Sequence, residues 1–170
     1  YGRDGFNTQG YNREGYGRDG FNSEGFNAQG VDRNGFNRDG IKTTDYTKDG
    51  WTVNEVSKKA PDGTITTTIT KTNDKNEKIV EVIKYNADGS VASSETQKFD
   101  SEGRIKSSVV VNADGSRNEK IYDYDSNGKV YESTYDYDKD GKKLGYAYIH
   151  KDANGNETLR NVTKFNYDSS

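Results

Sequence analysis

The stretch YNADGSVASSETQKFDSEGRIKSSVVVNADG, residues 85–115, contains the pattern that decides the fold. A ring or Val, then Asn or Asp, two further residues and Gly form one phrase, which occurs at 85–89, 99–103 and 111–115. Asn or Asp at the first position of a four-residue turn, with Gly at the fourth, is typical of a type I turn. The segments between the phrases are rich in Ser, Thr, Val and Ile, and they suit strands. The stretch therefore predicts β-hairpins joined by short turns.

The same phrase recurs from residue 61 to residue 170 at a nearly constant interval. Asn76 stands at one turn position where a further Gly would fall. Glycines mark the other turns: Gly63, Gly89, Gly103, Gly115, Gly128, Gly141 and Gly155. The successive separations are 13, 13, 14, 12, 13, 13 and 14 residues, which fits a turn unit of five plus a strand of about eight. Parallel strands would need crossovers of about a dozen residues. The interval therefore predicts an antiparallel meander of about eight strands.

The first 50 residues contain the turn phrase without the strands. Gly closes almost every pentad: Gly5, Gly10, Gly15, Gly20, Gly25, Gly30, Gly35 and Gly40. A ring opens most of them: Tyr1, Phe6, Tyr11, Tyr16, Phe21, Phe26 and Phe36. So many glycines exclude an α-helix, because each would cost about 1 kcal/mol. We expect a coil of five-residue turns whose rings stack along one line as an aromatic spine.

Five arginines of this array each precede an acidic or amide residue: Arg3, Arg13, Arg18, Arg33 and Arg38. They are expected to form salt ladders between coils or to stack on the rings. The array resembles the pentapeptide-repeat solenoid in its period. It departs from that family because the slot two places before the large residue holds Asp, Gln, Glu or Asn instead of a small residue.

Composition favours a thin structure. Leu, Ile, Val and Phe make up 27 of 170 residues, too few for a deep aliphatic core, yet 12% of residues are aromatic and the net charge is only −3. We therefore expect an all-β protein with a single-layer or thin sheet. Its predicted parts are a turn array at 1–50, a connector at 51–60 that begins with Trp51 as a cap, and the meander at 61–170. The interspersed charges and the lack of a long apolar run predict neither nucleic-acid binding nor membrane insertion.

Residues 124–130 (YDSNGKV) and 137–144 (YDKDGKKL) resemble YD repeats, the Tyr-Asp-x-x-Gly unit of bacterial RHS and wall-associated proteins and of the teneurins. The likeness covers residues 85–170, with a tighter 13-residue spacing and Asn or Phe in several slots. It implies a long, exported β-sheet. The resemblance thus places the chain outside the cell or on its surface, in a bacterium.

Two turn phrases match the first half of an EF-hand calcium loop. The candidate ligands are Asp123, Asp125, Asn127, Asp136, Asp138 and Asp140. The twelfth positions hold Thr134 and Ala147 in place of the bidentate Glu. Two interpretations stay open: hairpin turns whose Asp side chains bond their own backbone, or weak calcium binding between neighbouring turns. No other cofactor is indicated.

The tyrosines of the last strands form a second candidate site: Tyr131, Tyr135, Tyr137, Tyr146 and Tyr148. They either pack across strands or present a face to a glycan, a cell-wall component or another copy of the chain. His150, the only His, is expected to be ordinary surface, and no nucleophile or phosphate-loop motif argues for an enzyme. The leading hypothesis is a structural extracellular repeat protein, such as a stalk, filament subunit or surface-layer component, that self-associates through sheet edges and aromatic rows. The alternatives are an adhesin that uses its Tyr-rich faces and a calcium-stiffened spacer.

Overall fold

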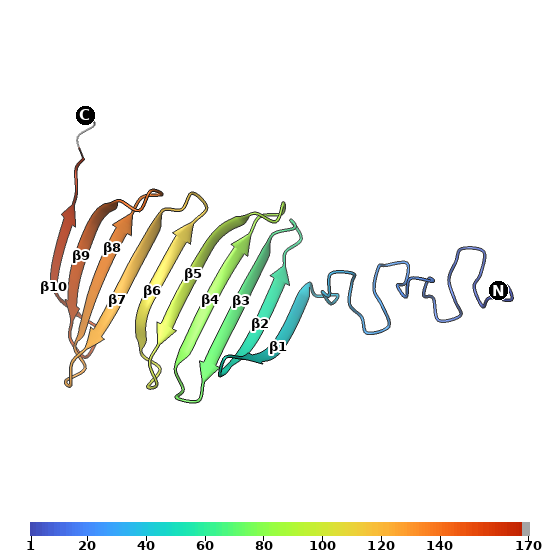
Figure 1. Cartoon of the computed structure of the whole chain (residues 1–170), viewed down its shortest axis with the longest axis horizontal. Helices are drawn as coiled ribbons and strands as arrows, with labels where there is room; N and C mark the ends of the chain where they lie inside the picture. Colours follow the sequence, from blue (N-terminus) through green and yellow to red (C-terminus); the bar gives the residue numbers. More distant parts are fainter. Residues whose placement is uncertain (168–170) are drawn as a thin grey trace.

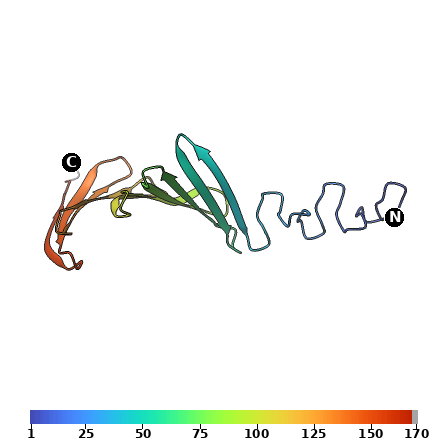
Figure 2. The same cartoon turned by 90° about the horizontal axis from the view of Figure 1, so that it is seen from below.

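The computed structural model describes residues 1–167, which contain no helix and form one open antiparallel sheet preceded by a chain of turns (Figure 1). Ten strands follow each other in sequence order across this sheet, so the predicted all-β meander is confirmed at this level. Within residues 1–167, no second layer covers the curved sheet (Figure 2). The strands are β1 (Ile41–Lys48), β2 (Trp51–Lys59), β3 (Ile65–Asn73), β4 (Lys78–Tyr85), β5 (Val91–Phe99), β6 (Ile105–Asn112), β7 (Arg117–Tyr124), β8 (Val130–Tyr137), β9 (Lys143–Lys151) and β10 (Glu157–Lys164).

One turn geometry is used both in the array and between the strands. Between β4 and β5, the Asn86 N–H donates to the Ser90 carbonyl at 2.8 Å and the Gly89 N–H donates to the Asn86 carbonyl at 2.9 Å. In the array, Asn7 and Gly10 form the same two bonds with Tyr11 and Asn7, at 2.8 and 3.0 Å. The glycines that close these turns have φ between 70° and 87°, and Asn76 takes their place with φ 60°.

The Asn or Asp at the start of a turn holds it with its side chain. Asn7 Oδ1 accepts the N–H groups of Gln9 and Tyr11, both at 2.9 Å. Where Gly2 replaces this residue, Asp4 accepts the N–H of Phe6 at 3.2 Å instead. A local oxygen acceptor thus replaces the packing that a small turn cannot provide.

The sheet begins earlier than the sequence predicts, which corrects the domain boundaries. Residues 41–48 are β1 instead of the end of the array, and the predicted connector is β2, with Trp51 as its first residue. The reason is the turn at Asp49 and Gly50, which have φ of 51° and 81° and form a two-residue hairpin loop. A pentad turn would have to start at position 47, which is Thr instead of Asn or Asp. The part of the chain described after residue 61 contains eight strands, β3 to β10, as predicted, and β1 and β2 extend the meander to ten.

The sheet has almost no core. Only Phe36, Val53 and Ile149 are buried hydrophobic residues among those described. Ser57 and Thr67 are buried across β2 and β3 and share a hydrogen bond of 2.8 Å. The backbone ladders and cross-strand pairs therefore carry most of the stability of this sheet. The array extends from the β1 end of the sheet along the long axis of the molecule (Figure 1).

Candidate binding face on strands β8 to β10

The strand register brings the five predicted tyrosines to one face of the sheet. Tyr131, Tyr135 and Tyr137 alternate along β8, and Tyr146 and Tyr148 alternate along β9. Tyr135 pairs directly with Tyr146, so both side chains lie on the same side. We call this group the tyrosine face: Tyr131, Tyr135, Tyr137, Tyr146, Tyr148, His150 and Phe165.

The sequence did not reveal two members of this face. His150 pairs with Tyr131, and their rings meet edge to face at 4.8 Å and 71°. Phe165 lies 5.8 Å from Tyr146, because its N–H donates to the Leu144 carbonyl at 2.8 Å and continues the ladder beyond β10. Strand alternation could have identified Phe165. Thr163 of β10 pairs with Tyr146 and lies on its face, so the residue two positions later, Phe165, lies on the same face.

Cations lie over the rings at one end of the tyrosine face. The Arg117 guanidinium is 3.9 Å from the Tyr137 ring centre, and Lys143 Nζ is 4.5 Å from that of Tyr135. Tyr131 and Tyr148 at the other end are exposed to 36% and 39%. The neighbouring Tyr135 hydroxyl raises the pKa of Tyr148 above its ordinary value. The face therefore offers flat apolar rings with hydroxyl groups and positive charges beside them.

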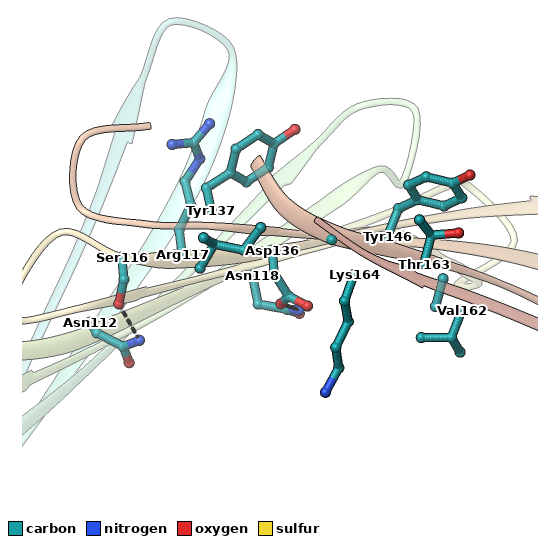
Figure 3. Close-up of a pocket in the computed structure, with 13 residues that line it drawn as sticks. Asn112, Ser116, Arg117, Asn118, Asp136, Tyr137, Tyr146, Val162, Thr163 and Lys164 are labelled. Atoms are coloured by element: carbon teal, nitrogen blue, oxygen red, sulfur yellow. Dashed lines mark hydrogen bonds between the residues drawn. The ribbon is translucent and has the colours of Figure 1, made fainter. Parts of the chain in front are cut away.

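A shallow hollow of about 380 Å³ adjoins this face but does not form a cleft. Figure 3 shows Arg117, Tyr137 and Tyr146 projecting to one side of the strands and Asn118, Asp136 and Lys164 to the other. Gly145 lines the hollow and allows β10 to approach closely, because a Cβ there would lie 2.7 Å from the Thr163 carbonyl oxygen. Its polar groups do not converge on one point, so it is not an enclosed ligand site.

The structure does not bring the six calcium candidates together. Asp123 pairs with Tyr131 on the tyrosine face, whereas Asp136 pairs with Asn118 on the opposite face. The turns of Asp125 and Asp138 lie at opposite ends of β8. Asp125 and Asp138 each accept two backbone N–H groups of their own turn, at 2.8 to 3.0 Å. In residues 1–167, no three His, Cys, Asp or Glu side chains are grouped so that they could hold a metal ion.

A partly buried ionic cluster lies on the face opposite the tyrosines. Glu132 is only 6% exposed, and its carboxylate lies 3.1 Å from Lys151 Nζ and 3.6 Å from Lys120 Nζ. Burial acts to raise the pKa of Glu132, but the hydrogen bond and charge of Lys151 and the charge of Lys120 outweigh it and lower this pKa. One carboxylate thus lies between two ammonium groups, and the cluster links β7, β8 and β9.

In the array, arginines cover four of the rings: Tyr1, Phe6, Phe21 and Phe26. Among residues 1–167, ring pairs occur only from Tyr131 onward, so the rings of the array do not stack on one another. The Arg18 guanidinium lies 4.7 Å from the Phe6 ring centre, and that of Arg33 lies 4.6 Å from Phe21. Contact between distant pentads is thus made by arginine.

The comparison with protein-family models found no match, and the search among curated proteins found none either. The described part of the chain contains no helix with the length and apolar character that crossing a bilayer requires. The proposed function therefore rests on the geometry of the tyrosine face, the sheet edges and the array.

Proposed function

We propose that the chain is a structural, extracellular repeat protein that serves as a stalk, filament subunit or surface-layer component. Its elongated form supports this proposal, because the turn array and the single-layer sheet lie end to end (Figure 1). The observation that carries it is the edge strand β10, which pairs with β9 on one side only within the described residues. An unpaired edge of this kind recruits another strand.

The outward backbone groups of β10 can be assigned from its ladder. The Phe165 N–H points to β9, where it donates to the Leu144 carbonyl. Because inward and outward groups alternate in an antiparallel pair, the backbone groups of Arg160, Val162 and Lys164 point away from β9. These three residues offer three N–H and three carbonyl groups to an added strand.

A proline substitution tests association through this edge. Val162→Pro removes an outward N–H and no bond to β9, and proline is tolerated at such positions. Val162→Thr is the matched control, since it keeps both the N–H and the β-branched shape. Sedimentation velocity and electron microscopy over a range of concentrations should show association of the parent and of Val162→Thr but not of Val162→Pro. A parent that stays monomeric at high concentration, or a Val162→Pro variant that assembles equally, would contradict the proposal.

We further propose that the array is a coil, which suits a stalk. The arginine contacts join residues 12 and 14 positions apart, as in Arg18 with Phe6 and Asp4. Equal steps with equal long-range contacts generate a helix of about three pentads per turn. Nuclear Overhauser contacts between the Phe21 ring and Arg33 would support the coil, and their absence would indicate a string of independent turns.

A glycan-binding adhesin is the second candidate, and the tyrosine face supports it. Its exposed rings can stack on sugar faces while their hydroxyl groups bond sugar oxygens. Tyr131→Ala and Tyr135→Ala should then abolish binding on a glycan array. Tyr122→Ala is the matched control, because Tyr122 pairs with Glu132 on the opposite face. Equal loss in all three variants, or no binding by the parent, would count against this function.

A further inference from the structure

The arginines of the array follow a spacing rule. Each array arginine that has a ring 12 residues before it lies over that ring, with distances to the ring centre of 4.6 to 5.7 Å. The pairs are Arg13 with Tyr1, Arg18 with Phe6, Arg33 with Phe21, and Arg38 with Phe26. Four separate places in the array therefore hold a guanidinium in the same way.

A carboxylate completes three of these places. Arg18 forms an ion pair with Asp4, Arg33 with Asp19, and Arg38 with Glu24, always 14 residues earlier. A carboxylate and a ring two residues apart thus form one guanidinium site, which binds the cation both by charge and by stacking.

Glu14 and Tyr16 have the same spacing, but no arginine belongs to them. The residue 14 positions after Glu14 is Ala28, whose side chain ends at Cβ. Within the described residues, Glu14 forms no ion pair and the Tyr16 ring contacts no cation.

The backbone of this place matches that of the filled ones. The Asn12 N–H donates to the Tyr16 carbonyl at 2.8 Å, and the Tyr16 N–H donates to Asn12 Oδ1 at 2.9 Å. Gly15 has φ 87°, close to the 83° and 86° of Gly20 and Gly25. The backbone turn is therefore that of the filled sites. Its Asn12 side chain corresponds to Asn22 of the Glu24 site, which accepts the Phe26 N–H at 2.9 Å, whereas the turns of the Asp4 and Asp19 sites begin with Gly.

We propose that Glu14 and Tyr16 form an open guanidinium site that binds an arginine side chain of a partner protein. A guanidinium is the fitting ligand because it is planar, stacks on a ring and pairs with a carboxylate at the same time. The neighbouring ring Tyr11 also lacks an arginine, but its corresponding partners are Gln9 and Ser23, which carry no charge. Tyr11 is therefore an internal control with a ring and no carboxylate.

The site can be tested by titrating the full chain with N-acetyl-arginine methylamide. The ring-proton chemical shifts of Tyr16 and Tyr11 in NMR spectra report binding. Tyr16 should shift in a saturable way and Tyr11 much less. The citrulline analogue, which has nearly the same shape and no charge, should leave Tyr16 unshifted. The lysine analogue should bind several-fold more weakly. A peptide with one exposed arginine should reproduce the shift, whereas a response to the small molecule alone would restrict the site to free guanidinium compounds and overturn the partner assignment.

Two variants complete the test. Glu14→Gln should lose the Tyr16 response, and Ala28→Arg should lose it too, because the introduced side chain fills the site from within the chain. The Ala28→Arg variant should also show the Tyr16 ring protons already displaced before titration, as for a ring covered by arginine. Equal shifts at Tyr11 and Tyr16, or undiminished binding by Ala28→Arg, would overturn the proposal.

Discussion

Single turn glycines set the backbone of the whole chain, and their conformation is costly for other residues. Gly89 has φ 84°, and a Cβ added there would meet no atom within 4 Å. Gly89→Ala therefore tests the conformation alone, and it should lower the free energy of unfolding by about 1–2 kcal/mol. Gly89→Asn should cost less, because Asn76 already adopts φ 60° at the same turn position. Urea denaturation measures both, and equal losses would contradict the explanation.

Glu132 is the residue whose side chain ties three strands together. Glu132→Gln keeps the shape but removes the charge that Lys120 and Lys151 share, so we expect a loss of about 1–2 kcal/mol in the free energy of unfolding. Because the folded pKa of Glu132 is lowered, its contribution is complete above the ordinary value of 4.5 and is lost as the pH falls through the lower folded value. The difference between parent and variant in urea denaturation should therefore shrink below pH 4.5. A difference that is constant down to pH 2 would exclude this role.

The turn carboxylates should add a second loss of stability in acid. Hydrogen bonds from the Ser90 hydroxyl and N–H lower the pKa of Asp88, and those from Ser116 do the same for Asp114. A lowered pKa gives stability that is present above the ordinary value of 3.8 and is lost as the pH falls below it. Denaturant midpoints measured from pH 7 to pH 2 should stay level above about 4 and fall below it. Asp88→Asn should flatten part of this fall, and a profile unchanged by the substitution would argue against the assignment.

At the scale of elements, the strand interval was predictable and the first hairpin was not. Asn or Asp with Gly three residues later locates the turns from Asn86 to Gly155, since their conformations depend on local chemistry alone. The turn at Asp49 and Gly50 was misassigned because Gly50 also fits the five-residue interval, and only the positive φ of Asp49 distinguishes a two-residue loop. The common face of Tyr135 and Tyr146 follows from their pairing across one such turn. The cations over these rings depend on the positions of long side chains, which no local pattern specifies.

The contacts between arginines and the rings of distant pentads should stabilise the arrangement of the array. Arg33→Ala and Phe21→Leu should each weaken it, with a coupling energy of about 0.5–1 kcal/mol for an exposed pair of this kind. Hydrogen exchange at the Gly20 and Gly35 amides, which close the adjacent turns, reports this coupling in a double-mutant cycle. The pair Arg18 and Phe6 is the matched repeat elsewhere in the array and should give a similar value. Additive effects in both cycles would show that the stacking stabilises nothing.

For the whole molecule, the thin sheet predicts graded instead of all-or-none stability. Each strand contacts only its neighbours in the sequence, so stability should resemble a sum of local terms, as in other repeat proteins. Native-state hydrogen exchange should therefore show the highest protection in β5 and β6 and a decline toward β1 and β10. Val109→Ala, in the middle of β6, should lower protection in β5 and β7 far more than in β1. Val53→Ala, in β2, provides the reciprocal control, with its largest effect in β1 and β3. Uniform loss of protection across all ten strands would show a single cooperative unit, and the elongated sheet would then need long-range coupling that its contacts do not contain.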